Sequence, residues 1–281
     1  MKWREGRRSQ NVQVASGRGG GVGKLGLGGV AAVVVISLLL GKNPLEMLGL
    51  VSQMTGGVGE QAGPAPDPER VDFVSAILGE TEDVWGGIFQ ASNMTYEQPL
   101  LTVFSGEVST ACGGGSSAMG PFYCPGDHQV YLDVTFFDEM KARLGGGGDF
   151  ANAYVIAHEV GHHVQTLLGV SDRMAQARQQ GQDVKGDNGL LVRQELQADC
   201  YAGVWAHLSE QKRHWLEQGD VETALATASA IGDDRLQKQA GGRVVPDAFT
   251  HGTAEQRVRW FKAGFAAGDP NACDTFKANP L

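Results

Sequence analysis

Residues 154–165 have the apolar spacing of a helix, and their centre reads His-Glu-Val-Gly-His from 158 to 162. Positions four apart lie on one face of a helix, so His158 and His162 can offer two imidazole nitrogens to one metal ion. Glu159 follows the first histidine and can reach a water molecule at that metal as its general base. The pattern therefore predicts a helix that carries a zinc site of the kind that hydrolyses peptide bonds.

The surroundings of this motif favour a half-buried metal site over the alternative, a surface helix with two histidines. Asp149 is placed to cap the helix, and Gly169 is placed to end it. Gly161 within the helix costs about 1 kcal/mol relative to alanine, which indicates that another segment packs closely against the backbone there. The polar triplet is flanked by five apolar residues, Val155, Ile156, Ala157, Val160 and Val164.

A catalytic zinc site normally takes three protein ligands and leaves its fourth position to water. The metzincin spacing would place histidine at position 168, where this chain has leucine. Glu195 is the best third ligand, within a second helical pattern over residues 191–205. Asp199 lies four residues later on the same face, where it can accept the outer N–H of a ligand histidine and fix its tautomer.

Two alternatives to this third ligand remain open from the sequence. Glu195 and Asp199 could form a solvated acidic helix face without a metal. Ligand chemistry alone also allows three later histidines as the third ligand, His207, His214 and His251.

Together with the motifs just described, several other segments resemble the putative neutral zinc metallopeptidase family of bacterial membrane-anchored proteins. The likeness covers nearly the whole chain and includes residues 2–9, 111–125, 130–133 and 250–257. The Glu-x-x-Ala-Asp pattern at 195–199 is also similar to the gluzincin arrangement of membrane-associated zinc proteases.

The resemblance implies an α+β fold class, with a zincin-like metallopeptidase domain that is mainly helical with a small sheet, behind a single N-terminal transmembrane helix. It also implies one Zn²⁺ per chain, with His158, His162 and Glu195 as ligands. Glu159 would then be the base, and Asp199 the outer partner of a ligand histidine.

The charge of the chain is unevenly distributed. The first 24 residues hold six Lys or Arg against one Glu, or +5, so the total of −9 leaves −14 for the remainder. An acidic main domain argues against nucleic acid as a partner.

Residues 25–40 carry no charge, and this length is a little short of the ~20 residues that a spanning helix needs. We expect an uncleaved anchor over residues 25–41; a cleaved signal peptide and a buried core helix are the alternatives. The preceding positive charge would place the N-terminus in the cytoplasm. The expected location is the bacterial cytoplasmic (inner) membrane, crossed once, with the catalytic domain on the periplasmic or extracellular side.

Four segments follow from this pattern: a basic cytoplasmic segment, the anchor, a flexible linker rich in Gly and Pro, and the metallopeptidase domain, at residues 1–24, 25–41, 42–69 and 70–281. Within the domain we expect helices over residues 71–89, 221–240 and 253–267, and strands over residues 100–104 and 130–134. The second strand could bind an extended substrate along its edge, although a plain core strand is the stronger interpretation.

Four cysteines fit an oxidising compartment. Cys112 and Cys124 bracket a glycine-rich loop that could close easily, and Cys200 and Cys273 would then pair by elimination. The alternative is four free buried thiols.

A zinc peptidase usually also needs a donor that stabilises the tetrahedral oxyanion. His251, in a polar turn, is the first candidate for this catalytic role; Tyr123 and Tyr131 are alternatives, and a surface histidine without a role is the competing interpretation. His163 points about 100° around the helix from the second ligand and is interpreted as packing. Nothing in the sequence ties His128 to the zinc.

The sequence therefore predicts a zinc-dependent peptidase that uses a metal-activated water with Glu159 as general base. The expected partners are a protein or peptide substrate and the membrane, through the N-terminal helix. One alternative is a membrane-anchored binding or scaffold protein with a structural zinc. Another is a zinc amidase that acts on cell-wall peptide.

Overall fold

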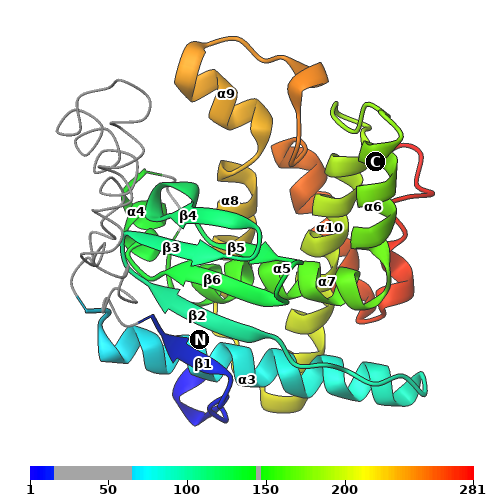
Figure 1. Ribbon diagram of the computed structural model, residues 1–281. Coiled ribbons are helices and arrows are strands. Elements are labelled where there is room, and N and C mark those ends of the chain that lie inside the picture. The colour runs from blue at the N-terminus through cyan, green and yellow to red at the C-terminus, as the bar shows by residue number, and fades with distance from the viewer. Residues whose placement is uncertain (16–64, 144–146) are drawn as a thin grey trace, which may run out of the picture.

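The computed structural model describes residues 1–15, 65–143 and 147–281. The described chain is α+β and mainly helical (Figure 1). Its α-helices are α3 (Pro68–Ala91), α4 (Phe136–Arg143), α5 (Asp149–Leu167), α6 (Val170–Gln179), α7 (Leu190–Arg213), α8 (Asp220–Ala230), α9 (Asp233–Gly241) and α10 (Ala254–Ala267). Short 3-10 turns lie at Trp3–Glu5, Ser117–Met119, Pro246–Ala248 and Pro270–Cys273.

The described strands form a four-stranded sheet and a separate hairpin. The sheet order is β1-β2-β6-β5, with β1–β2 and β2–β6 parallel and β5–β6 antiparallel. Its strands are β1 (Val12–Val14), β2 (Leu100–Phe104), β5 (Phe122–Cys124) and β6 (Gln129–Asp133), and the hairpin is β3 (Glu107–Thr110) with β4 (Gly113–Ser116). The predicted strand over 130–134 is therefore the inner strand β6, a core strand, and β5 forms the edge beside it.

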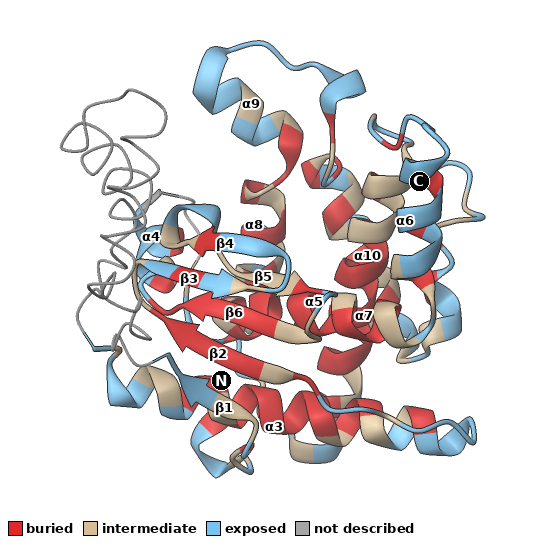
Figure 2. Cartoon of the chain, viewed as in Figure 1, coloured by how far each residue is buried: buried red, intermediate tan, exposed pale blue. Residues whose placement is uncertain are grey.

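The core lies between the sheet and the helices α3, α5 and α7. Figure 2 shows buried residues along β2 and β6 and along the facing helices, whereas α9 projects with mostly exposed residues. A Cβ atom at Gly161 would lie 3.1 Å from the Cα of Ala198, so α5 and α7 approach each other closely at that point. This close approach is the reason, predicted from the sequence, for a glycine in the middle of α5.

Two predicted helix features differ from the structure. Asp149 is the first residue of α5 rather than its cap, and its carboxylate accepts a hydrogen bond from the indole N–H of Trp3 at 2.9 Å. The helix expected over 221–240 is broken between α8 and α9. Gly232 lies at this break, and a Cβ atom there would lie 2.4 Å from the backbone nitrogen of Ala254, so α10 leaves no room for a side chain.

The N-terminal residues 1–15, expected in a basic segment apart from the domain, belong to the folded domain. Trp3 is buried, and β1 extends the sheet through β2. Arg7 forms an ion pair with the buried Glu82 at 2.6 Å, and Arg8 pairs with Asp72 at 2.6 Å. The positive charge that suggested a membrane topology thus complements acidic side chains of α3.

The fold class predicted from the sequence is corrected in one part. No helix in residues 1–15, 65–143 or 147–281 is long and apolar enough to cross a membrane. The segment 25–41, where the anchor was expected, lies outside the described residues.

The cysteines pair as predicted. Cys112 is bonded to Cys124, with Cα atoms 5.8 Å apart, and Cys200 is bonded to Cys273, with Cα atoms 5.6 Å apart. The first disulfide joins the β3–β4 hairpin to the edge strand β5. The second joins α7 to the last 3-10 turn of the chain.

Candidate metal centre

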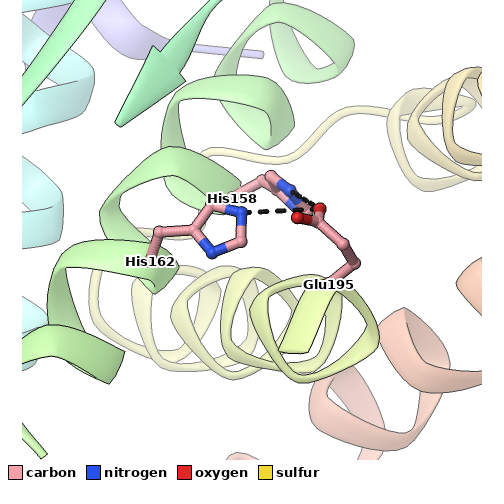
Figure 3. Close-up of side chains that lie close together, drawn as sticks. All are labelled: His158, His162 and Glu195. Atoms are coloured by element: carbon pink, nitrogen blue, oxygen red, sulfur yellow. Dashed lines mark hydrogen bonds and ion pairs between the residues drawn. The ribbon is translucent and has the colours of Figure 1, made fainter. Parts of the chain in front are cut away.

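Helices α5 and α7 bring the three predicted ligands together. His158 and His162 project from successive turns of α5, and Glu195 reaches them from the first turns of α7 (Figure 3). The Nε2 atoms of His158 and His162 lie 3.2 Å and 3.5 Å from Oε2 of Glu195. All three potential ligand atoms lie within 4.8 Å of one another.

This donor set fits a zinc ion. Zinc bonds of about 2.0–2.1 Å in a tetrahedron separate neighbouring donor atoms by about 3.3 Å, which matches the two distances to Glu195. The Nδ1 atoms face away from the site: Nδ1 of His158 lies 2.9 Å from Oδ1 of Asp199, and Nδ1 of His162 lies 2.9 Å from Oε1 of Gln165. When each Nδ1–H donates outward, each Nε2 lone pair points toward the shared site.

Asp199 is fully buried and is surrounded by donors. Besides His158, it accepts hydrogen bonds from Nε and Nη2 of Arg257, both at 2.9 Å, and from the hydroxyl of Tyr154. Burial alone would raise the pKa of Asp199, but the positive charges of Arg257 and His158 lower it to about 2. Asp199 therefore stays ionised and keeps the outer nitrogen of His158 protonated.

The predictions from sequence gave Arg257 no role, although it closes one of the segments that resemble the family. Arg257 is buried, and its side chain lines the same cleft as the ligands. Only the packing of α10 against α7 brings this guanidinium to Asp199, 58 residues earlier in the chain. In the sequence, Arg257 is an arginine within an amphipathic helix, and this pattern normally indicates a solvated side chain.

The pKa values of the other two carboxylates at the site are shifted in opposite directions. Burial would raise the pKa of Glu195, but the charges of His162 and His158 and their hydrogen bonds lower it well below its usual range. Burial also raises the pKa of Glu159, and here the opposing charges of His158 and His162 do not reverse the rise. Glu195 is thus suited to ligate a cation as an anion, and Glu159 to accept a proton.

Glu159 lies in the wall of an open cleft beside the ligands. It is 8 % exposed, and no group among the described residues forms a hydrogen bond with its carboxylate. The cleft runs between the segment before and within β5 on one side and the α8–α9 region on the other. Besides the ligands, Glu159, His251 and Arg257, it is lined by Met119, Gly120, Pro121, Phe122, Tyr123, Phe136, Tyr154, Val155, Ile231 and Leu236.

The structure places His251 in this cleft. One carboxylate oxygen of Asp233 accepts the backbone N–H groups of Thr250 and His251 at 2.7 Å and of Gly252 at 3.2 Å, which fixes the turn. The other oxygen lies 3.3 Å from Nδ1 of His251, and this hydrogen bond raises the pKa of the imidazole. The same Nδ1 lies 2.9 Å from Oγ1 of Thr250. Asp233, which the predictions from sequence did not include, thus holds the half-exposed ring on its Nδ1 side.

The two alternative donors are less suited to the cleft. Nε2 of His163 lies 2.6 Å from the carbonyl oxygen of Glu97, which can only accept, so Nδ1 of His163 is the acceptor for the hydroxyl of Tyr123 at 3.2 Å. Burial lowers the pKa of His163 to about 4, which keeps the ring neutral. The Tyr123 proton is therefore directed toward His163. Tyr131 donates to Asp127 at 2.9 Å and does not line the cleft.

The remaining histidines lie away from the ligand group. Nδ1 of His207 bonds to the carbonyl oxygen of Phe265 at 2.7 Å, and His214 is an exposed residue just after α7. The ring of His128 packs 5.9 Å from that of His163 rather than at the site. Among the residues that the structure describes, His158, His162 and Glu195 form the one group with the spacing of a metal site.

Comparisons with known proteins agree on one family. A family model described as "Putative neutral zinc metallopeptidase" matches residues 1–276. The chain is 48% identical over 288 residues to "Uncharacterized protein YpfJ" of Escherichia coli (strain K12), covering 98% of this chain and 99% of that protein. It is also 48% identical over 196 residues to "Uncharacterized protein Rv2575" of Mycobacterium tuberculosis, covering 66% of this chain and 65% of that protein. No solved structure matches the chain.

Proposed function

Because the chain belongs to the putative neutral zinc metallopeptidase family, we propose that it is a zinc-dependent peptidase with Glu159 as its general base. One observation carries this proposal. Three potential ligand atoms converge within 4.8 Å, and a carboxylate without a hydrogen-bond partner among the described residues lies beside them in an open cleft. A purely structural zinc site is closed by protein ligands and needs no such base.

Each group of residues in the cleft has a separate role in the proposed hydrolysis. A zinc ion held by His158, His162 and Glu195 supplies the Lewis acidity that polarises a carbonyl and makes water more acidic. Glu159 takes the proton of the attacking water and passes it to the leaving amine, a role that its raised pKa favours. His251, oriented by Asp233, donates to the oxyanion of the tetrahedral intermediate.

The substrate that this cleft favours is an extended polypeptide. Among the described strands, β5 pairs only with β6, so its other edge carries no strand from this part of the chain, and residues 120–123 line the cleft. A peptide in extended conformation can add to such an edge through backbone hydrogen bonds. The edge strand β5, rather than the inner strand β6, is therefore the proposed platform for the substrate.

The test is zinc-dependent hydrolysis of an unstructured protein by the full chain. We expect zinc-loaded protein to cleave casein, chelation to abolish cleavage, and one equivalent of Zn²⁺ to restore it. Glu195→Gln, which keeps the size of the side chain and removes the anionic ligand, should lower the zinc content sharply. Zinc binding without casein cleavage, but with release of amine from cell-wall peptide, would support the amidase. Zinc binding without either reaction would support the scaffold.

Removing the imidazole of His251 should lower turnover without lowering zinc content. We expect His251→Ala to reduce kcat by roughly 10²- to 10³-fold, the usual effect of losing one oxyanion donor. Asp233→Asn, which weakens the orientation of the ring, should reduce kcat by a smaller factor. The measurement is kcat and KM for a casein-derived peptide at saturating zinc. An unchanged kcat in His251→Ala would remove this residue from the mechanism.

A further inference from the structure

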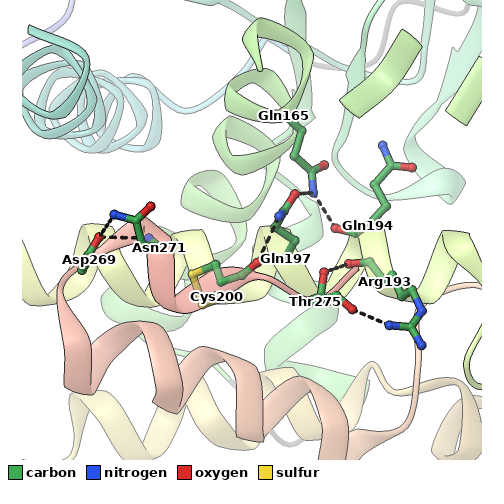
Figure 4. Close-up of a disulfide and its surroundings, with 9 residues drawn as sticks. Gln165, Arg193, Gln194, Gln197, Cys200, Asp269, Asn271 and Thr275 are labelled. Carbon is green, nitrogen blue, oxygen red and sulfur yellow. Dashed lines mark hydrogen bonds between the residues drawn. A yellow bond between two sulfur atoms is a disulfide. The ribbon is translucent and has the colours of Figure 1, made fainter. Parts of the chain in front are cut away.

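The side chain of Gln165 lies between the ligand His162 and the backbone of α7. Its Oε1 is 2.9 Å from Nδ1 of His162, and its Nε2 is 2.7 Å from the carbonyl oxygen of Gln194 and 3.1 Å from Oε1 of Gln197. Gln165 is fully buried, so water does not compete for these hydrogen bonds. Figure 4 shows the Gln165 amide directed toward the carbonyl of Gln194 and the side chain of Gln197.

The orientation of this amide is determined by its partners. The carbonyl oxygen of Gln194 can only accept, so the NH₂ group of Gln165 must face it and Oε1 must face His162. An oxygen can only accept from Nδ1, so Nδ1 of His162 carries the proton. Nε2 of His162, on the side of Glu195, is then the ring nitrogen that would give up its proton to ligate zinc.

A second glutamine fixes the first. Nε2 of Gln197 donates to the carbonyl oxygen of Cys273 at 3.0 Å, which directs Oε1 of Gln197 toward Gln165. The disulfide between Cys273 and Cys200 holds this carbonyl against α7. Two backbone carbonyls therefore orient a chain of hydrogen bonds that ends at His162.

The two ligand histidines are thus held by different chemistry. Nδ1 of His158 donates to a carboxylate, that of Asp199, whose charge is balanced by Arg257. Nδ1 of His162 donates to a neutral amide. Glu159 and Asp199 are already buried at the site, and Glu195 is half-buried. A further carboxylate would add an unbalanced buried charge, whereas an amide fixes the tautomer without one.

We propose that Gln165 is a positioning residue that sets the zinc affinity of the site by fixing the tautomer and orientation of His162, and that Gln197 holds it in place. The inference rests on the proposed function, because it assumes that His162 ligates zinc.

The experiment is a zinc competition titration of the full chain with a chromophoric chelator. Gln165→Leu removes the acceptor for His162, and we expect the zinc dissociation constant to rise roughly 10- to 100-fold, as for other outer partners of ligand histidines. Gln194→Leu is the matched control, since the side chain of Gln194 forms no hydrogen bond among the described residues and only its backbone carbonyl contacts Gln165. The zinc dissociation constant of this variant should be unchanged.

A conservative variant separates positioning from stability. Gln165→Glu keeps an oxygen for His162 and, when protonated, an O–H for the carbonyl of Gln194, so it should recover most of the affinity that Gln165→Leu loses. It also provides a test if Gln165→Leu fails to fold. Thermal unfolding with chelator present reports stability independently of zinc.

The possible outcomes test the role of Gln165 separately from the proposed peptidase function. A Gln165→Leu protein that unfolds at lower temperature but binds zinc like the Gln194→Leu control would overturn the positioning role and leave the peptidase proposal standing. If Gln165→Leu does not fold, a zinc dissociation constant of Gln165→Glu that is raised as much as expected for Gln165→Leu would overturn the positioning role. An unsubstituted chain that binds no zinc would overturn both.

Discussion

Glu159→Gln is expected to reduce casein hydrolysis by roughly 10²- to 10⁴-fold, the range of general-base contributions, while zinc content stays at one equivalent. Glutamine has the size of glutamate but no basic oxygen, so it removes proton transfer and leaves the packing of α5 intact. The effect should appear in kcat, because the base acts on the water rather than on binding of the substrate. The measurement is kcat and KM at saturating zinc, together with the metal content of the purified protein.

Glu139→Gln on the exposed surface of α4 is a suitable control, since it makes the same chemical change away from the cleft. Its activity should equal that of the unsubstituted chain. Full activity in Glu159→Gln would exclude this residue as the base. Loss of zinc along with activity would instead mean that Glu159 is needed to form the metal site.

Arg257→Met is expected to destabilise the fold by about 3–5 kcal/mol, the cost of leaving one member of a buried ion pair without its partner. The Asp199 carboxylate is fully buried and would lose two hydrogen bonds of 2.9 Å along with the balancing charge. The free energy of unfolding should be measured by urea denaturation with chelator present, so that zinc binding does not contribute. Arg259→Met, which removes a half-exposed arginine of the same helix, should cost less than about 1 kcal/mol.

Two further measurements test whether the Asp199 charge causes this loss of stability: the free energy of unfolding of a double variant, and that of the unsubstituted chain as a function of pH. Adding Asp199→Asn to Arg257→Met should restore part of the stability, because the buried charge is then removed. The pKa of Asp199 is lowered on folding to about 2, so its contribution to stability is present above about pH 4, its range in the unfolded chain, and is lost as the pH falls toward 2. A destabilisation by Arg257→Met that does not respond to Asp199→Asn would contradict this explanation.

The local patterns of the sequence predicted the helices that carry the metal site. Candidate metal ligands could be predicted because each motif places its residues four apart on one helix face: His158 with His162, and Glu195 with Asp199. Gly161 indicated that another segment packs close to the first helix. The partners of the ligands were harder to predict. Asp199 shared a helix face with Glu195, but Arg257 reaches it only through tertiary packing, which no local spacing encodes.

The N-terminal residues show a contact that reasoning from charge did not predict. Arg4, Arg7 and Arg8 before an apolar segment were interpreted as a signal of membrane topology. In the structure Arg7 and Arg8 pair with acidic residues of α3, more than sixty positions later. Such pairing between distant residues cannot be predicted from local sequence. A basic N-terminus is equally consistent with a membrane topology signal and with ion pairs inside the domain. The edge position of β5 was hidden for a similar reason, since strand order in a sheet depends on contacts distant along the chain.

The sheet has a consequence for how this domain can be handled as an isolated protein. Its first strand, β1 (Val12–Val14), comes from residues that precede α3 by more than fifty positions, and it covers one side of β2. A fragment beginning near residue 70, the boundary suggested by composition, would lack that strand and would present the N–H and C=O groups of β2 to solvent. Uncovered strand edges recruit strands from other molecules. The fragment would therefore be prone to self-association, and a discontinuous domain of this kind is best studied with its first fifteen residues in place.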